Sequence, residues 1–416
     1  MKARPWIPSG ALIAGHIAHG LSWAALLGLG VEDWTGPSLR GIAWIHLVAL
    51  AWITLTALAV LVYVIPQFTD AQWRLEPLAR SGLTLFGIGS FAFVASLWGE
   101  RIDAAAWSAL VVAFGLAAYL AAAFATLRAA MRGPRVEAAI ARAFTAVAAF
   151  LAVAAALGVA MAWALRGSFG PRLLTGVPLA HAHLAGLGWL TLLIMGVSAR
   201  TASPIFGARS SSPWRHRAVG MLVFAGTLVL AGGLWSNLLA VVWGGSALTV
   251  AGIALYALDV ADIARRATVT HRPPQVLSAA ALVWLIVATI LGIGAVAGAR
   301  WQAVYAFVAL AGWAGNMLIA HLHHIGTRLI ATIRRGDEDE TQPGELLITP
   351  LSWLTVTSFE CALVVGAFGV ISSDGGAFVH VAGILGLLGW ASMTSNVALA
   401  FRRAGMPRRT TNLVEL

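Results

Sequence analysis

Residues 181–192 read HAHLAGLGWLTL, and residues 46–55 read HLVALAWITL. In both stretches a histidine stands six residues before a tryptophan, inside an apolar run that ends shortly afterwards in Pro-x-Phe. A third stretch, YAFVALAGW at residues 305–313, keeps the same frame but has aromatic residues where the others have histidine. Repetition at long, similar spacing predicts one structural unit used several times.

The three tryptophans of these stretches define the period of the repeat. Trp52 and Trp189 are 137 residues apart, and Trp189 and Trp313 are 124 apart. The chain therefore divides into units of about 1–135, 136–270 and 271–416. No long linker or low-complexity segment separates them, so we expect a single domain over residues 1–416.

Composition predicts an all-α integral membrane protein. Of the 416 residues, 59% are hydrophobic and only 11% are charged, which lies far outside the range of soluble domains. Apolar runs of about twenty residues, long enough to span a bilayer as helices, recur from end to end. We count about twelve, four in each unit, at 9–31, 41–66, 80–99, 104–128, 141–165, 174–199, 218–235, 238–258, 276–298, 302–326, 347–371 and 375–401.

The net charge of +10 reflects topology rather than a nucleic-acid partner. If the N-terminus lies inside, the inner segments hold 22 of the 27 Lys and Arg residues, and the outer loops hold only five. This asymmetry is the positive-inside pattern and predicts both termini in the cytoplasm, with the chain in the inner membrane and its basic residues at anionic lipid headgroups. A nucleic-acid face would need a basic stripe interleaved with aromatic residues, and the sequence has none. The single cysteine excludes internal disulfides and cysteine-based metal clusters.

Four histidines are expected at one depth in the outer half of the membrane. His46 lies six residues after Arg40, His181 and His183 follow an expected outer loop, and His380 lies six residues after Asp374. At 1.5 Å per residue these offsets are similar depths. Intramembrane histidine is rare and marks functional sites. Imidazole can be an axial ligand of haem iron or a copper ligand, although these residues can also simply hydrogen-bond neighbouring helices together.

The spacing within the second stretch separates two roles. Residues two apart on a helix point roughly 200° apart, so His181 and His183 cannot chelate one metal from one face. They can serve two different centres, or one centre and one hydrogen-bond partner. Because His46 and His183 occupy the same place in the repeat, we expect them as the axial pair, with His181 and His380 at a second centre or supporting it.

A second group of polar residues is expected deeper in the membrane. Two histidine pairs with i, i+3 spacing can form an inner metal site, ligate an inner haem or frame a quinol headgroup; alternatively they are wet interfacial residues. Glu360 lies in the middle of the eleventh span, where a carboxylate is expected to relay protons or to partner a histidine or arginine, unless it is a protonated structural group. The inner histidines are His16 and His19 near the N-terminus, and His321, His323 and His324 at the end of the tenth span.

The segment that contains His181 and His183 resembles the His-x-His helix of subunit I of the haem-copper oxidases. The similarity is greatest to the cbb3-type oxidases and the nitric oxide reductases, which also have twelve helices in three four-helix arcs. That resemblance implies that His181 binds a high-spin haem and that His183 and His46 bind a low-spin haem. It implies b-type haem, with copper as a further metal.

Three departures from that family narrow the expectation. The family carries its motif on helix 10, where this chain has Tyr305 and Phe307, and here the motif is on helix 6. The span at 218–235 lacks the adjacent histidines that hold copper, and no helix carries a row of carboxylates for a proton channel. The chain is therefore more similar to a divergent relative, such as the NnrS-type membrane haem proteins linked to nitric oxide.

These observations predict a polytopic haem protein with a redox role: electron transfer, or binding and reduction of NO or O2 as a haem-dependent oxidoreductase. Quinol or a cytochrome-type protein would donate electrons, and the chain would act alone, as a homo-oligomer or in a respiratory complex. The main alternative is a proton- or metal-ion-coupled transporter, although scarce proline within the spans argues against broken transport helices. A cofactor-free membrane subunit of a respiratory complex is the other alternative.

Overall fold

The computed structural model describes residues 7–35, 38–167, 176–209, 212–269, 271–295, 299–336, 343–372 and 374–406. Within these residues the regular structure is helical throughout, and twelve helical spans are long and apolar enough to cross a membrane. The expected all-α, multi-pass architecture with twelve spans is therefore confirmed.

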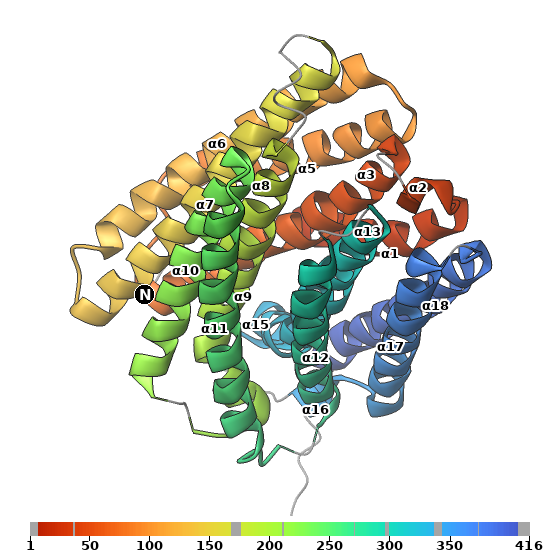
Figure 1. The fold of residues 1–416 in the computed structure, drawn as a ribbon. Coiled ribbons are helices and arrows are strands. Elements are labelled where there is room, and N and C mark those ends of the chain that lie inside the picture. Colours follow the sequence, from red (N-terminus) through yellow and green to blue (C-terminus); the bar gives the residue numbers. More distant parts are fainter. Residues whose placement is uncertain are drawn as a thin grey trace, which may run out of the picture.

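The first four spans form the N-terminal third of the molecule (Figure 1). The second span is continuous but changes its winding in the middle. Its start is capped by Ser38, whose hydroxyl accepts hydrogen bonds from the backbone N–H groups of Arg40 and Gly41, two groups that lack helical partners. The elements are α1 (Ser9–Ala25) with the short turn η1 (Leu26–Gly28), α2 (Glu32–Thr35), α3 (Leu39–His46) with η2 (Leu47–Thr54) and α4 (Leu55–Thr69), α5 (Glu76–Trp98) and α6 (Ile102–Ala130).

The middle four spans repeat this order. A tight turn joins the last two at Asn237, which adopts a left-handed conformation (φ 54°) that asparagine tolerates better than most residues. Proline at the first or second helical position starts several of the helices, where its missing N–H is not needed. The elements are α7 (Arg135–Leu165), α8 (Val177–His183) with η4 (Leu184–Thr191) and α9 (Leu192–Phe206), α10 (Pro213–Ser236) and α11 (Leu239–Ala264).

The last four spans include the longest one, residues 301–335. It extends past the expected apolar run because the helix continues into an amphipathic end that carries Arg334 and Arg335. The elements are α12 (Pro273–Gly294), α13 (Ala299–Phe307) with η6 (Val308–Gly315), α14 (Asn316–His321), η7 (Leu322–Gly326) and α15 (Thr327–Arg335), α16 (Pro343–Leu346), α17 (Thr349–Ile371) and α18 (Gly376–Ala404).

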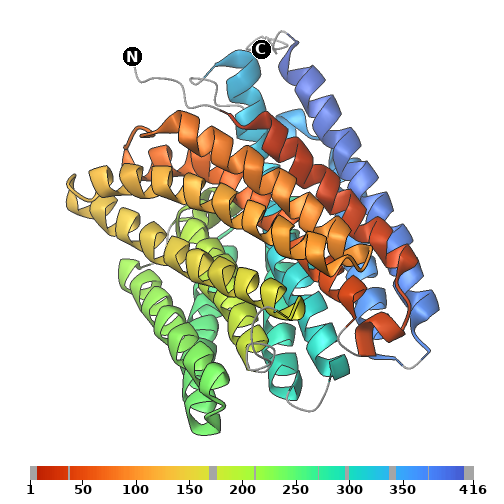
Figure 2. The same cartoon turned by 90° about the horizontal axis from the view of Figure 1, so that it is seen from above.

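Three antiparallel hairpins, α5–α6, α10–α11 and α17–α18, have the most extensive pairwise packing in the molecule and lie toward its periphery in Figure 2 (orange, green and blue). Each is held closely by glycine. A methyl group added at Gly89, Gly233 or Gly369 would lie 2.7–2.8 Å from a backbone nitrogen of the partner helix. Small residues at such crossings allow close van der Waals packing, the main attraction between helices in lipid.

The second, sixth and tenth spans meet inside this outer layer. The middle segment η6 of the tenth span contacts both η2 and η4. The three tryptophans of the sequence repeat lie on these segments, and each is at most 2% exposed. The repeated stretches therefore come together at the core of the bundle.

Candidate functional site

Each of the three inner spans has an eight-residue π-helical segment at its centre. The segments η2, η4 and η6 begin directly after His46, His183 and Phe307 and contain Trp52, Trp189 and Trp313, respectively, as their sixth residue. π-Helical turns are rare in proteins and occur frequently at functional sites, because the wider winding re-aims the side chains that precede it. The matching start points mark the residues just before these segments as the candidate site.

A lower set of contacts links the three segments through tryptophan. Trp189 Nε1 donates to Thr54 Oγ1 (3.1 Å), and Trp313 Nε1 donates to Thr191 Oγ1 (3.0 Å). The threonine in each case follows the tryptophan of its own segment by two residues.

The third position of this set is different. Gly315 stands where the other two segments have threonine, and a methyl group there would lie 2.9 Å from the Trp52 ring. Trp52 instead stacks on His19 of α1, with ring centroids 3.8 Å apart and planes within 11°. The indole of the first segment thus packs against its neighbour directly rather than through a hydroxyl.

An upper set of ring pairs lies one to two turns before the tryptophans. His181 faces His46, with ring centroids 6.3 Å apart and planes at 25°. Tyr305 faces His183 at 6.0 Å and 25°. In each pair, one residue directly precedes a π segment: His46 precedes η2, and His183 precedes η4. The other residue stands three positions before the first residue of a different π segment: His181 before η4, and Tyr305 before η6.

The remaining pair of this upper set is purely hydrophobic. Trp44 stacks on Phe307 with centroids 5.4 Å apart and planes at 14°. Both rings are at most 1% exposed, and Trp34 packs edge-on against both of them. Of the three matching contacts, one is a closed aromatic stack, one pairs tyrosine with histidine, and one pairs two imidazoles.

The two imidazoles of the His46–His181 pair are held by backbone carbonyls. His46 Nδ1 lies 2.8 Å from the Ile42 carbonyl oxygen, and His181 Nδ1 lies 2.9 Å from that of Ala154 on α7. Because a carbonyl can only accept, the proton of each neutral ring is on Nδ1 and a lone pair is on Nε2. The hydrogen bonds of these two rings among the described residues are made by Nδ1 alone, and both rings are partly accessible.

The walls around this pair fix the orientation of the rings. Phe93 of α5 packs edge-on against His46, with centroids 5.2 Å apart. On the other side, Gly158 of α7 leaves room for His181: a methyl group at this position would be 3.2 Å from His181 Cε1. The pair therefore sits between the second and sixth spans with α5 and α7 as supports.

His183 has a different partner from the one expected. Its Nδ1 bonds the Leu179 carbonyl (2.8 Å), and its Nε2 is 3.5 Å from the Tyr305 hydroxyl, a long contact. The repeat led us to expect His183 beside His46, but the structure brings His181 there. His380 is not near either pair: it is exposed on α18, without a contact to another histidine among the described residues.

The N-terminal histidines lie on α1 and contact different neighbouring helices. His16 Nε2 is 2.7 Å from the Thr394 hydroxyl, and its ring stacks on Trp390 with centroids 5.4 Å apart. His19 is fully buried beside Trp52, and neither of its ring nitrogens has a hydrogen-bond partner among the described residues.

The histidines of the tenth span are also tied to nearby groups. His321 Nδ1 bonds the Met317 carbonyl (2.7 Å), and its Nε2 is 2.8 Å from the Thr201 hydroxyl of α9. His323 Nδ1 bonds the Ile319 carbonyl (2.9 Å), and His324 is partly exposed at the next position. Across the described residues, no three His, Cys, Asp or Glu side chains gather closely enough to hold a metal ion.

Glu360 and Asp259 each have polar partners on other helices. Glu360 of α17 accepts hydrogen bonds from Trp284 Nε1 (2.8 Å) and Asn316 Nδ2 (2.6 Å). Asp259 of α11 is only 3% exposed and pairs with His216 Nε2 of α10 at 3.1 Å. In the sequence, Asp259 stands shortly before Arg265 and Arg266 at the end of an apolar run, a position that does not distinguish it from an ordinary helix end.

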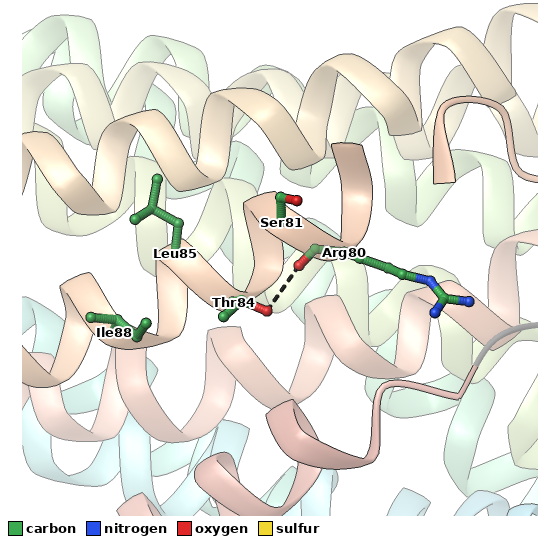
Figure 3. Close-up of a pocket in the computed structure, with 5 residues that line it drawn as sticks. All are labelled: Arg80, Ser81, Thr84, Leu85 and Ile88. Atoms are coloured by element: carbon green, nitrogen blue, oxygen red, sulfur yellow. Dashed lines mark hydrogen bonds between the residues drawn. The ribbon is translucent and has the colours of Figure 1, made fainter. Parts of the chain in front are cut away.

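The hollows in the structure lie away from the histidine pairs. An open groove of about 450 Å³ runs along the outer face of α5, lined by Arg80, Ser81, Thr84, Leu85 and Ile88 (Figure 3). Phe93, which packs on His46, lies farther along the same helix. At 1.5 Å per residue it is roughly 8 Å from Ile88 at the near end of the groove and roughly 20 Å from Arg80 at the far end. A closed apolar cavity of about 20 Å³ lies beside Trp189 and Tyr119, and it is too small for a cofactor.

Neither a protein-family model nor a curated protein matches this chain.

Tyr305 and the two threonines are site residues that sequence reasoning missed. The sequence did show Tyr305 in the histidine frame, but as a substitution rather than as a partner of His183. It also showed Trp-x-Thr in the first two stretches and Trp-x-Gly in the third, a pattern that indicates a contact made twice and replaced once.

Proposed function

We propose that the chain is a membrane haem protein with a redox role, in which His46 and His181 supply the two axial imidazoles. The observation that carries this proposal is the facing pair itself. Two histidines from different helices lie with ring centroids 6.3 Å apart, and each has Nδ1 tied to a backbone carbonyl. Two histidines from separate helices are suited to a six-coordinate haem.

The residues present fit such a group in their chemistry. Histidines that bind a metal usually donate their other N–H to a carbonyl or carboxylate, which fixes the ring and makes Nε2 the ligand atom. Both His46 and His181 have this arrangement.

When bound, a haem would supply one-electron chemistry, and the chain's own residues would orient and insulate it. Ala154 and Ile42 hold the ring orientations through their carbonyls, and Phe93 covers the edge of His46. Burial and the polarity of the surroundings are among the protein's means of setting the potential of a haem.

This pairing differs from the one inferred from the repeat, in which His46 and His183 were equivalent. The residues that directly precede the three π segments do not face one another. Each faces a residue of another unit that lies two positions before the one preceding that unit's π segment. His183 correspondingly faces Tyr305: its Nδ1 proton bonds the Leu179 carbonyl, so its Nε2 can accept from the phenol hydroxyl.

We further propose that the molecule consists of three four-helix units around the three π segments, with both termini in the cytoplasm of a cell whose inner membrane holds the chain. The matched Trp–Thr and ring-pair contacts support the units, and the bias of Lys and Arg supports the orientation. Electrons would come from a quinol or a cytochrome-type donor, with NO or O2 as the candidate acceptors.

Haem content of the purified protein tests the proposal. We expect about one low-spin b-type haem per chain for the His46–His181 pair, lost in His46→Ala and in His181→Ala. His380→Ala is the matched control, because this exposed histidine has no contact with the pair, and it should retain the haem. A folded wild-type protein without haem after expression with haem supply would refute the proposal and favour the transporter.

A further inference from the structure

Glu360 occupies an unusual place for a carboxylate. It lies eleven residues from each end of α17 (Thr349–Ile371), which is about 16 Å by the helical rise and hence the middle of the span. A charged group at this depth is costly and is a functional-site candidate by default.

The partners of Glu360 are neutral. Trp284 Nε1 donates to Oε2, and Asn316 Nδ2 donates to Oε1, so that each oxygen receives one hydrogen bond. Among the described residues, no lysine or arginine forms an ion pair with this carboxylate. Two neutral donors stabilise the ionised form by hydrogen bonding but provide no opposite charge.

The protonated form can be accommodated by a change in only one partner. A carboxylic acid must donate its proton, and the indole of Trp284 cannot accept it because it is a donor only. The amide of Asn316 can accept if it turns over, which presents Oδ1 instead of Nδ2. The site thus has two satisfied states that differ by one proton and by the orientation of one amide.

We propose that Glu360 and Asn316 form a reversible proton-binding site in the membrane interior, reached from the lipid-facing seam between α12 and α17. The ligand is a single proton, which forms an O–H bond on Glu360 Oε1 while the Asn316 amide turns over. No electron moves in this step, and the proposal does not depend on haem.

Access to the site comes from the outer surface of the two helices. Glu360 is partly exposed, and the next residue, Cys361, is exposed. Apolar side chains on either side also face outward: Val364 and Val283 are each 59% exposed, and Ile286 is 45% exposed. An apolar reagent dissolved in the bilayer can therefore approach the carboxyl.

Asn316 connects the site to the core. It directly follows the π segment η6, and the residues at the same place after η2 and η4 are Leu55 and Leu192. Only the third segment therefore has a polar side chain that can respond to a proton at this point. The change in the amide takes place three residues from Trp313.

Other titratable groups near Glu360 do not share its proton. On α17 the neighbour is Cys361, and on α1 it is His19, which packs on Phe359. The helices α13 and α18 also pack against α17; their titratable residues include Tyr305, whose hydroxyl is 3.5 Å from His183 Nε2, and the exposed His380. The described part of α12 has no titratable residue. Within the described residues, none of these groups is hydrogen-bonded to Glu360.

Labelling of the full-length protein in liposomes with an apolar carbodiimide tests the proposal, because this reagent needs a protonated carboxyl accessible from lipid. We expect labelling at Glu360, read by peptide mass spectrometry, that decreases as the pH rises. Cys361→Ser should leave it unchanged, which excludes the neighbouring thiol, and Glu360→Gln should abolish it. Gln resembles the protonated acid, so this variant should fold.

Asn316→Leu is the sharpest variant, because leucine is the residue at this place in the other two segments. It removes the amide's hydrogen bond to both forms of Glu360, but the bond to the ionised carboxylate is the stronger one, so the labelling midpoint should move upward by about one pH unit. An infrared carbonyl band of a protonated acid, shifted in D2O and absent in Glu360→Gln, should follow the same midpoint. Absence of both labelling and band at every pH in the folded protein, or a midpoint unchanged in Asn316→Leu, would overturn the proposal.

Discussion

The contact between the second and sixth spans and the contact between the second and tenth spans have the same layout but different side chains. In the first, His181 faces His46 at 6.3 Å, and both rings are partly accessible. In the second, Trp44 stacks on Phe307 at 5.4 Å, and both rings are buried. The same layout therefore forms a closed stack of an indole and a phenyl ring at one contact and a candidate ligand site with two imidazoles at the other.

Comparing the contacts separates the structural features of the three inner spans from those that could bind a ligand. The π segments and the tryptophans below them are present at all three contacts, so they do not by themselves indicate a cofactor. Imidazole with a free Nε2 on both sides occurs at only one contact in the described residues. Four sets of substitutions test whether the His46–His181 contact binds a ligand and the other contacts are structural.

Replacing the His46–His181 pair by the residue types of the Phe307–Trp44 stack should have the largest effect on bound haem. In the double variant His46→Phe, His181→Trp, the residues of the Phe307–Trp44 pair replace their positional equivalents. We expect complete loss of bound haem, because both ligands are gone, while the protein folds, because the same layout is stable elsewhere in the molecule. Haem content and size-exclusion behaviour measure the two outcomes, and haem retained by this variant would contradict the ligand assignment.

Removing the Trp44 ring from its stack on Phe307 should destabilise the protein without changing its haem content. Trp44 is 1% exposed, and its Nε1 donates to the Ser22 carbonyl at 2.8 Å. Truncation of a buried aromatic ring costs about 3–5 kcal/mol, so Trp44→Ala should lower the free energy of unfolding by that amount. Denaturant titration in detergent checks this value, with the haem per folded chain unchanged. Haem loss from the folded variant would mean that the two contacts are not independent.

The tryptophan links should have intermediate effects. Thr54→Val removes the acceptor of Trp189 Nε1 and leaves a buried N–H without a partner, which costs about 1–3 kcal/mol. Thr54→Ser keeps the hydroxyl and should lose less. At the third position the opposite change is unfavourable, because a methyl group in Gly315→Ala would press on the Trp52 ring. Equal stability of Thr54→Val and Thr54→Ser would show that the hydrogen bond contributes nothing.

The smallest effect is expected from the support of His181. A methyl group in Gly158→Ala would lie 3.2 Å from His181 Cε1, so the ring must shift by a few tenths of an ångström. Haem affinity should fall about tenfold, which is ~1.4 kcal/mol. Gly232→Ala is the control, because nothing lies within 4 Å of a methyl group there. Equal affinity in both variants would show that α7 does not position the ligand.

The fold was predictable because lipid imposes a simple rule on sequence. All backbone polar groups in a bilayer must be bonded within the chain, so apolar runs of sufficient length become helices. The twelve expected spans follow from this rule. The observed helix ends differ from the expected ones where the hydropathy of the sequence does not mark the end of the helix. The tenth span continues nine residues beyond the expected end at residue 326, because an arginine-rich turn is still helical.

The site was predictable only in part. The spacing of His181 and His183 indicated two different partners, and the structure has two, His46 and Tyr305. Which partner belongs to which histidine depends on how the spans are rotated about their axes, and residue spacing does not determine that rotation. The π segments change the rotation further, and no propensity of their residues signals them.

His380 illustrates the same limit. Its distance from a predicted loop set its depth, but depth does not give the helix face, and its ring points outward. The three stretches with tryptophan were informative for another reason: their repetition fixed both depth and face relative to one another.

Electron paramagnetic resonance of the oxidised, purified protein tests the central claim most directly, because it reports the axial ligands of a ferric haem. We predict a low-spin signal typical of two imidazole ligands in the wild type, its conversion in both His46→Ala and His181→Ala, and its retention in His183→Ala. A low-spin signal that survives in His46→Ala or His181→Ala, or that disappears only in His183→Ala, would contradict the account.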